Sequence, residues 1–566
     1  MLDVQSSECV TVRVNGTPGG LMRSILRGGR LVDGTGAAAR AADVEVVDGR
    51  IGRIGDVESV SGAQVIDLDG LVLAPGFIDI HTHFDAQLFW DADFTPSCWH
   101  GVTTAVQGNC GFGIAPTRPH ERDLIMQTLE NVEGMNVDTL RSGIDWCFET
   151  FPEYLTALRG LPKRINLGSY IGHTPVRTYV MGADDAVRRV ATDDEVAQMR
   201  QIVVEAMHAG ATGFSSSFAP SHNGAHGMPV PSRLADVREI RALCTAVADS
   251  GRGIVEMTYG PQMPLDEAAK WASELGVRIT WGALLTGLFG PRGTTNDMLD
   301  QASAISGDIW PQVSCREIVF LMTMEDPYYF GTAPSFKRVL QAPRDERVAV
   351  YRDPAWREQA KAEILDYRPG AYERASIAES VVFSADRGRS MADIARDRNV
   401  HPFDLWLDCA IAEDLTTRFR IVSRNEDEVE VAQLLRDPRV VLGAHDAGAH
   451  VEMLCDSCFP THLLGYWVRQ KQALSLEQAV WRLTGQPADL WRLRERGSIR
   501  PGYHADLVAF DPDSVAALPA DRVFDFPANG DRLVSRSAGI HHIWVNGEPA
   551  RLDGADIPSA AAGVLV

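Results

Sequence analysis

The sequence predicts an α/β fold: a (β/α)8 TIM-like barrel with a small β-sandwich domain and a helical insertion. Three observations support this prediction. Short apolar strand-like segments alternate with helical segments through the middle of the chain, and similar strand pieces occur near both ends. One segment before the last strand is far too long for a loop. The 566 residues are enough to bury a large core.

Eight segments of the middle region have the composition of buried strands. Helical segments separate them, such as 194–209, which is rich in Glu, Ala and Met, and 263–275. Eight such alternations are typical of a (β/α)8 barrel, whose active site lies at the C-terminal ends of the strands. The predicted strands are 75–83, 102–109, 165–172, 210–217, 253–259, 277–282, 308–315 and 439–446.

The regions outside the barrel strands divide into further parts. Near the start, Asp48-Gly49 marks a hairpin turn, and the strand pieces beside it resemble those at 505–510 and 543–547. We therefore expect one β-sandwich assembled from both termini. A charged helical pattern predicts an inserted subdomain that caps the barrel mouth. The predicted parts are an N-terminal extension at 1–24, β-sandwich parts at 25–74 and 497–553, a barrel at 75–496 with the insertion at 320–437, and a tail at 554–566.

The composition excludes some classes of partner. The formal net charge is -22, and such a surface repels nucleic acid and anionic membranes. There is no basic run and no apolar run long enough to span a bilayer. The first residues are polar and lack the charged-then-apolar pattern of a signal peptide, which predicts a cytoplasmic protein.

The most informative segment runs from residue 75 to 85 and contains two histidines one residue apart. Side chains alternate along a strand, so His81 and His83 point the same way and can offer two imidazoles to one cation. Imidazole suits zinc, and a zinc ion with an open position activates water. The alternative is a pair of histidines on a strand edge with no ligand role. The nearby acids Asp79 and Asp85 favour the metal site.

Two other predicted strand ends carry residues of the same chemistry. Cys110 follows the second strand in a Gly-Asn-Cys-Gly turn, and a thiolate there would be a strong zinc ligand. The alternative is a small buried residue in a turn. Asp446 follows the eighth strand, where a carboxylate can bind the metal and move a proton. In isolation an Asp before Ala-Gly is more often a turn residue.

Together these motifs resemble the amidohydrolase superfamily, and within it the D-aminoacylase, or N-acyl-D-amino-acid deacylase, branch. The resemblance extends from Ile25 to Asp553. It implies a hydrolase that cleaves the amide C–N bond of a small N-acyl amino-acid-like substrate with metal-activated water. It also implies zinc near His81, His83, Cys110 and Asp446, with Asp446 as the proton shuttle. The motifs that carry it are Pro75 to His83 with Asp85, Gly101 to Gly111, Asp446 to His450, Gly485 to Ala488, and Gly497 to Val508.

The chain departs from that branch at two expected ligands. The family places one histidine on strand five and one on strand six, but the segments 254–259 and 279–283 contain none. One zinc ion between His81, His83 and Asp446 is the outcome we expect, with two ions as an alternative. Replacement ligands could instead come from Glu256, the best donor, or from His173, His222 and His445, or the site could bind metal too weakly to work.

The residues expected to clamp a substrate carboxylate are also missing. The family lysine after strand six is Ala283 here, and the family arginine is absent between Ala447 and Leu464. Arg177 and Arg316 could substitute, although for each a structural pair with a neighbouring acid is the commoner role. His173 and His450 could orient the scissile group or hold Asp446. The candidate substrate-binding residues are thus His173, Arg177, His222, Arg316 and His450.

Two rival functions remain open at this stage. The first keeps the fold but changes the reaction to a lyase, a decarboxylase or a cyclic-amide hydrolase with a single metal. The second is a catalytically impaired scaffold subunit, since two ligands are lost. In either case we expect no nucleic acid and no membrane as partner. The resemblance implies a small-molecule substrate and a homo-oligomer, because barrel enzymes of this type often self-associate.

Overall fold

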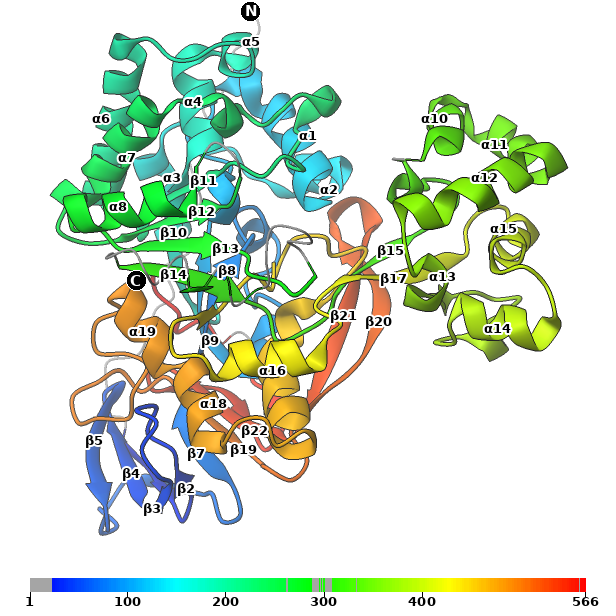
Figure 1. The fold of residues 1–566 in the computed structure, drawn as a ribbon. Coiled ribbons are helices and arrows are strands. Elements are labelled where there is room, and N and C mark those ends of the chain that lie inside the picture. The colour runs from blue at the N-terminus through cyan, green and yellow to red at the C-terminus, as the bar shows by residue number, and fades with distance from the viewer. Residues whose placement is uncertain are drawn as a thin grey trace, which may run out of the picture. The chain divides into compact units, whose positions relative to one another are not determined.

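A computed structural model of the chain describes residues 23–260, 263–287, 308–331, 333–558 and 560–566, together with 295, 297, 299 and 300. These residues form two compact units, both drawn in Figure 1. The first contains the described residues up to Arg316, with Glu428–Val451 and Cys455–Val566. The second contains Glu317–Asp427 and Glu452–Leu454. The predicted extension lies mostly outside the described residues.

The first unit is built around an eight-stranded parallel sheet. Its strands follow one another in chain order, and a parallel bridge between Thr82 and Ala447 connects the first strand to the segment after the last. This nearly closed sheet confirms the predicted (β/α)8 barrel. The strands are β8 (Phe77–Thr82), β9 (Val102–Gln107), β10 (Asn166–Gly172), β11 (Gly213–Ser217), β12 (Ile254–Thr258), β13 (Ile279–Gly282), β14 (Ile309–Val313) and β18 (Val441–Leu442).

The last barrel strand is shorter than the sequence predicts. Only Val441 and Leu442 pair as β18, whereas 439–446 was expected to be extended. The reason is the backbone beyond Leu442: Ala444 has φ 53° and Asp446 has φ 50°, both in the left-handed region. The chain therefore leaves the sheet early, and Asp446 lies on a loop at the strand's C-terminal end.

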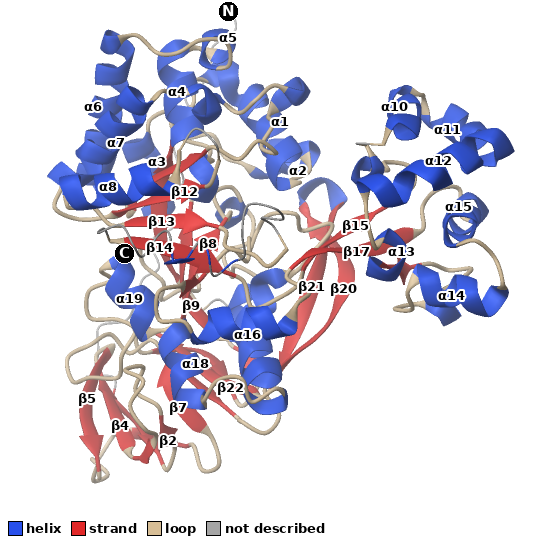
Figure 2. Ribbon diagram, viewed as in Figure 1, coloured by secondary structure: helices blue, strands red, loops and turns tan. Residues whose placement is uncertain are grey.

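Helices cover the outside of the barrel strands, as Figure 2 shows for α6, α7 and α8. Local signals fix their ends. Thr192 and Glu195 form a capping box at the start of α6, and Gly210 ends it in the left-handed region. The main helices of this unit are α1 (Arg122–Glu133), α2 (Val137–Gly143), α3 (Phe151–Gly160), α4 (His173–Met181), α5 (Ala183–Ala186), α6 (Asp193–Ala209), α7 (Val237–Asp249), α8 (Leu265–Leu275), α16 (Glu428–Arg436), α17 (Phe459–His462), α18 (Leu476–Leu483) and α19 (Gly485–Trp491).

Strands from both ends of the chain form two further sheets in the first unit. The four-stranded sheet contains β5 (Arg50–Gly55), β4 (Asp43–Val47), β1 (Arg23–Arg27) and β6 (Gln64–Asp67). The seven-stranded sheet contains β24 (Ala555–Asp556), β23 (Glu548–Leu552), β22 (Ile540–Val545), β19 (Leu507–Phe510), β7 (Val72–Pro75), β2 (Arg30–Leu31) and β3 (Arg40–Ala41). Both contribute to one buried cluster, for example Leu26 from β1 and Trp544 from β22.

Two other segments complete the first unit. A long hairpin pairs β20 (Ala516–Phe526) with β21 (Gly530–Ala538). The end of the chain, which was predicted to be a tail, pairs with the barrel: Leu565 forms a parallel bridge with Leu167, and the Val566 amide donates to the Leu167 carbonyl at 3.0 Å.

The second unit has its own aromatic core. Phe330, Phe336, Trp356, Phe403 and Trp406 are buried together in it. Besides the expected helices it contains a three-stranded antiparallel sheet, in the order β15-β17-β16. Its elements are β15 (Ile318–Met322), α10 (Pro334–Gln341), α11 (Arg344–Arg352), α12 (Pro354–Tyr367), α13 (Ala371–Arg374), β16 (Ala375–Glu379), α14 (Met391–Arg398), α15 (Pro402–Ala412) and β17 (Arg418–Arg424).

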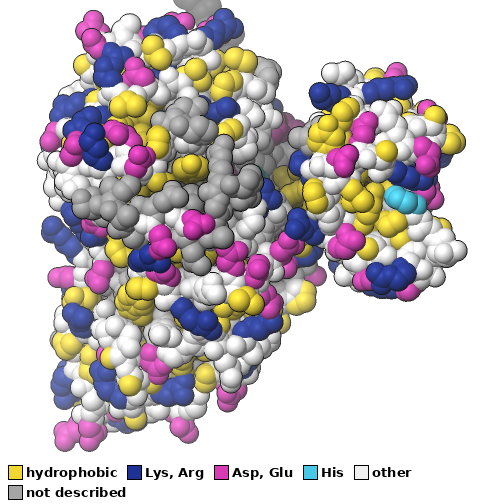
Figure 3. Space-filling view, in the orientation of Figure 1, with side chains coloured by type: hydrophobic (Ala, Val, Ile, Leu, Met, Phe, Trp, Pro, Cys, Tyr) yellow, Lys and Arg dark blue, Asp and Glu magenta, His cyan; other side chains and the backbone are white. Residues whose placement is uncertain are grey.

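Charged side chains of both signs are mixed on the surface that Figure 3 draws. On the face drawn in Figure 3, Lys and Arg side chains are dispersed among Asp and Glu and do not gather into one basic patch. Among the described residues, no helix has the length and apolar character that a membrane span requires.

Candidate metal centre

The end of β8 and the loop after β18 bring two imidazoles and one carboxylate together. The Nε2 atom of His81 lies 3.0 Å from Asp446 Oδ1, and the Nε2 atom of His83 lies 3.7 Å from the same oxygen. The His83 amide donates to the Ala447 carbonyl at 2.7 Å, so the backbone fixes this approach. The two histidines are 2% exposed, whereas the Asp446 side chain is 37% exposed. Solvent therefore reaches the carboxylate side of the cluster.

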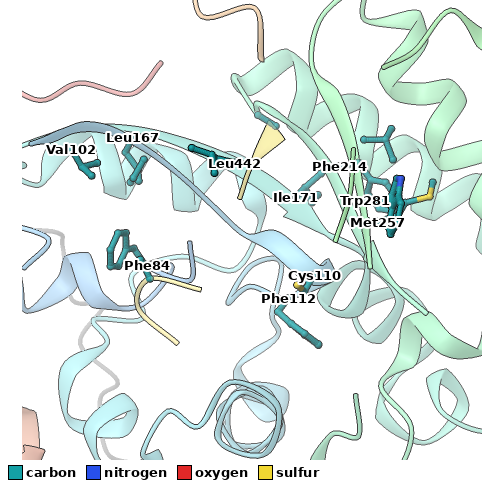
Figure 4. Close-up of a cluster of buried hydrophobic side chains, with 14 of the residues drawn as sticks. Phe84, Val102, Cys110, Phe112, Leu167, Ile171, Phe214, Met257, Trp281 and Leu442 are labelled. Atoms are coloured by element: carbon teal, nitrogen blue, oxygen red, sulfur yellow. The ribbon is translucent and has the colours of Figure 1, made fainter. Parts of the chain in front are cut away.

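Cys110 joins this group from the turn after β9. Its Sγ lies 3.3 Å from His81 Nε2, and one ligand atom from each of His81, His83 and Cys110 lies within 4.8 Å of the others. The turn requires glycine at Gly111, which has φ 73° and whose added Cβ would lie 2.8 Å from Ser216 Cα. Cys110 belongs to the buried hydrophobic cluster drawn in Figure 4.

Gln312 on β14 orients the first imidazole. Its Oε1 lies 2.7 Å from His81 Nδ1 and also accepts a hydrogen bond from the Ala444 amide at 3.1 Å. A carbonyl oxygen only accepts, so His81 carries a proton on Nδ1 and its Nε2 faces Asp446 and Cys110. Outer partners of this kind fix the ring orientation of a metal-ligating histidine. The sequence analysis did not identify Gln312.

Glu256 on β12 lies against the cysteine turn. Its Oε2 accepts a hydrogen bond from the Cys110 amide at 2.7 Å, while its buried Oε1 has no hydrogen-bond partner. A Cβ placed on Gly282 would lie 3.7 Å from both Glu256 Oε1 and His81 Cε1. An unpartnered carboxylate oxygen thus lies close to the histidine pair, where the sequence suggested a replacement ligand.

Glu133 is a member of the cluster that the sequence analysis missed. It is the last residue of α1, and its Oε2 lies 3.6 Å from His83 Nε2 and 4.0 Å from His450 Nε2. The sequence did contain an indication that Glu133 is buried. Ile125, Leu129 and Val132 form the buried face of this helix, and an acid on that face at 133 is costly unless it has a partner.

Burial and charge set the protonation of the histidines and Asp446. Burial lowers the pKa of His83 to about 4, although the nearby Asp446 carboxylate opposes this shift. Burial also opposes charge on His81, but the nearby Cys110 and Asp446 outweigh it and raise the pKa of His81 well above its usual range. Burial opposes charge on Asp446, yet the two histidines that face it outweigh burial and hold the pKa of Asp446 well below its usual range. Asp446 is therefore a carboxylate at neutral pH.

The pKa values of the other acidic groups in the cluster are raised, in contrast to that of Asp446. Burial raises the pKa of Glu256 to about 7, and it raises that of Glu133 well above its usual range. Burial likewise raises the pKa of Asp79 and of Asp85 to about 7 each. Burial also raises the pKa of the Cys110 thiol to about 12. Several acidic groups thus face one small volume without enough positive charge to ionise them all.

The donor set fits a divalent ion of borderline softness. In a tetrahedral zinc site with ligands at about 2.0 Å, neighbouring donor atoms are about 3.3 Å apart. The separations of His81 Nε2 from Cys110 Sγ and Asp446 Oδ1, 3.3 and 3.0 Å, are close to that value. Nitrogen, sulfur and carboxylate oxygen are all zinc ligands in proteins.

The structure engages His173 and Arg177 in a different network. His173 Nδ1 lies 2.8 Å from Ser216 Oγ, and its Nε2 lies 2.8 Å from Glu239 Oε1. Arg177 pairs with the same Glu239 and donates to the Ala186 carbonyl at 3.1 Å. Both ring nitrogens of His173 are therefore occupied by protein groups, and the structure does not bring either residue into contact with the histidine pair.

Some of the remaining candidate residues lie at the histidine–carboxylate cluster, and others have partners outside it. His450 lies beside Glu133, and His222 Nδ1 lies 2.7 Å from Ser217 Oγ. Burial lowers the pKa of His222 to about 4, and the charge of Asp446 opposes that shift. Arg316 donates to Asp456 at 2.6 Å. His445, also considered as a ligand, instead stacks on Phe459, with ring centroids 3.8 Å apart.

Comparison with known proteins places this geometry in a family. The profile of the Amidohydrolase family matches residues 64–276 and 375–550. D-aminoacylase of Alcaligenes xylosoxydans xylosoxydans is 30% identical over 547 residues, covering 93% of each chain. N-acyl-D-aspartate deacylase of the same organism is 30% identical over 537 residues, covering 92% of this chain and 91% of the relative.

The structural comparison agrees. A solved structure of D-aminoacylase, from work on its binuclear metal centre, matches with a TM-score of 0.64 at 28% identity. The match covers 96% of this chain and 99% of that chain. Both the sequence match and the structural match cover nearly the whole chain. They therefore include the two histidines at the end of the first barrel strand and the aspartate after the last. The chain therefore belongs to the amidohydrolase family, in its D-aminoacylase branch.

Proposed function

We propose that the protein is a metal-dependent hydrolase that cleaves the amide C–N bond of a small N-acyl amino acid or a close analogue. The observation that carries this proposal is the convergence of His81, His83 and Asp446 at the C-terminal ends of the barrel strands. The similar relatives support the substrate class, since they are named D-aminoacylase and N-acyl-D-aspartate deacylase.

His81, His83 and Asp446 would hold the ion, and Cys110 and Glu256 are further candidate ligands beside it. A divalent ion in this position supplies a hydroxide nucleophile at neutral pH and a Lewis acid for the amide carbonyl. Asp446, ionised and partly open to solvent, accepts the proton of the attacking water and returns it to the leaving nitrogen.

We propose that the ion is zinc and that the active enzyme binds one ion per chain. The mixed nitrogen, sulfur and oxygen donor set supports zinc. The absence of histidine from β12 and β13 supports a single ion, because the second pair of imidazoles that the branch uses has no counterpart on those strands. A cytoplasmic location and a homo-oligomeric state stay predictions of the sequence.

His222 and His450 are the best-placed substrate-binding candidates. His222 packs against Phe112 beside the cysteine turn, and His450 lies beside Glu133. Burial lowers the pKa of each, so both are neutral imidazoles that can hydrogen-bond an amide or a carboxylate. His173, Arg177 and Arg316 have protein partners in the networks described above. We propose that they support the shape of the site and that the substrate contacts the first two.

The test is an assay of amine release. The purified enzyme, stripped with a chelator and reloaded with zinc, is offered panels of N-acyl-D- and N-acyl-L-amino acids. Asp446→Asn should lower kcat by about 100-fold or more, since general acid–base catalysis contributes about 10²–10⁴-fold. Asp489→Asn, an exposed aspartate on α19, is the matched control. Carbon dioxide release, or no amine release by zinc-loaded enzyme across the panels, would contradict the proposal.

A further inference from the structure

Resting on the function proposed above, we propose that the Glu133 carboxylate is a ligand of the metal ion, supplied by helix α1. This would add a donor to a site whose strands β12 and β13 lack histidine. Those strands read Ile-Val-Glu-Met-Thr and Ile-Thr-Trp-Gly, without a histidine. A site limited to His81, His83 and Asp446 has few protein ligands, and Glu133 lies directly beside it.

Glu133 lies beside His83 at a separation longer than a direct hydrogen bond. Its Oε2 lies 3.6 Å from His83 Nε2 and 4.0 Å from His450 Nε2. Both separations exceed the usual 2.7–3.2 Å range of an N–H···O hydrogen bond. The separation of Glu133 from the proposed ligand His83 is near the spacing of about 3.3 Å between neighbouring donors on a tetrahedral ion. The separation of His83 Nε2 from Asp446 Oδ1, 3.7 Å, is of the same kind.

The backbone holds Glu133 at the same loop that carries Asp446. Helix α1 ends immediately after Glu133, because Gly134 adopts φ 60° and its amide donates back to the Glu130 carbonyl at 3.1 Å. The His450 amide then donates to the Glu133 carbonyl at 2.5 Å. The end of α1 and the loop from Asp446 to His450 are thus joined by a main-chain hydrogen bond, which positions the Glu133 side chain independently of any ion.

Buried charge gives an independent reason for an ion at this point. Asp79, Asp85, Glu133 and Glu256 are each less than 5% exposed, and Asp446 faces the same volume. Within the part of the chain that the structure describes, no lysine or arginine forms an ion pair with these five carboxyl groups. Buried carboxylates are costly unless they are paired or bind metal. A ligand role for Glu133 resolves that cost at the residue nearest to His83.

The test measures metal affinity by competition with a chromogenic chelator, on the full-length protein. Glu133→Gln should weaken zinc binding by about 100-fold, because the neutral amide is a poor ligand for zinc. Glu133→Asp keeps the charge but shortens the side chain by one methylene, and should also weaken binding. Glu130→Gln is the matched control: it lies one turn earlier on α1, and its side-chain oxygen accepts from the Val137 amide.

The outcomes separate this proposal from the proposed function. Unchanged zinc affinity in either folded Glu133 variant would overturn the ligand role, even if kcat falls, because Glu133 would then act only on protons or substrate. Wild-type protein that binds no zinc would overturn the metal-dependent function itself. Weakened binding in the Glu133 variants, with Glu130→Gln equal to wild type, supports the proposal. Thermal melts of the metal-free proteins verify that each variant is folded.

Discussion

The imidazole of His81 is held from both of its nitrogens. Gln312 lies at Nδ1, while Asp446 and Cys110 lie at Nε2. The ring can therefore neither flip nor rotate without losing a buried hydrogen bond. Holding the ring reduces the conformational entropy that metal binding must otherwise remove.

Replacing Gln312 should separate this orienting role from simple packing. Gln312→Leu removes the acceptor and should weaken zinc binding by about 10–100-fold, the usual range for outer partners of ligating histidines. Gln312→Glu keeps the accepting oxygen, and the amide nitrogen that it replaces has no hydrogen-bond partner. It should therefore retain most of the affinity. Zinc affinity is measured by the same chelator competition. Equal losses of affinity in the two variants would show that the packing of the Gln312 side chain matters, and not its hydrogen-bond acceptor.

The residues that the sequence made visible are those in dense local motifs. His81 and His83 share one strand, and Cys110 and Asp446 each lie in a short turn after another strand. Glu133 lies 50 positions beyond His83, at the end of a helix with no motif around it. Its role depends on a contact with His450, which is more than 300 residues away, so local patterns could not reveal it.

Helix α1 is the element that connects the metal cluster to the outer layer of the barrel. Its buried face packs into the core, and its C-terminus carries Glu133 into the cluster. The end of the helix depends on Gly134, whose left-handed backbone suits glycine far better than a residue with a side chain.

Gly134→Ala should therefore act on the site as well as on stability. An alanine forced into the left-handed region costs about 1 kcal/mol, and relaxation of that strain would shift Glu133. We expect a small fall in Tm and weaker zinc binding. Gly276→Ala is the control, since Gly276 ends α8 with φ 64° and its added Cβ would meet nothing within 4 Å. If both variants lose Tm but keep wild-type zinc affinity, α1 does not position a ligand.

Strand prediction succeeded where strands are buried on both faces. All residues of β8, β9 and β10 are buried, and their sequences contain apolar and small polar residues but no lysine or arginine. The strands of the second unit were missed although β15 is a run of five apolar residues, because a short apolar run does not distinguish a strand from a buried helical segment. In β17 the residues Arg418 to Ile421 alternate Arg with apolar residues, and this short period of two was the available signal.

At the scale of the whole molecule, buried neutral histidines connect distant parts of the first unit. His100 Nδ1 lies 2.7 Å from Thr461 Oγ1, and its Nε2 donates to the Ser535 carbonyl at 2.9 Å. Burial lowers the pKa of His100 to about 4. The ring thus links the start of the barrel to the C-terminal hairpin only while it is neutral.

This link predicts one contribution to the pH dependence of stability. Between about pH 6.5 and pH 4 the unfolded chain binds a proton at His100 that the folded chain does not, so the contribution of His100 to stability falls as the pH falls. For this pKa shift the loss reaches about 3 kcal/mol. The buried acids Asp79, Asp85 and Glu256, whose pKa values are raised to about 7, change stability in the opposite direction. The measurement is therefore the difference in Tm between His100→Gln and wild type by scanning fluorimetry, which should shift in favour of the variant from pH 7 to 4.5. A difference that stays constant over this range would contradict the assignment.

The position of the bound ion tests the account most directly. Crystals of zinc-loaded protein, measured on both sides of the zinc absorption edge, give the place of each ion independently of any assumed ligand. We predict an anomalous peak at about 2 Å from His81 Nε2, His83 Nε2 and an Asp446 oxygen. Zinc-loaded crystals with no peak among these three groups, or with zinc bound only elsewhere, would contradict the assignment.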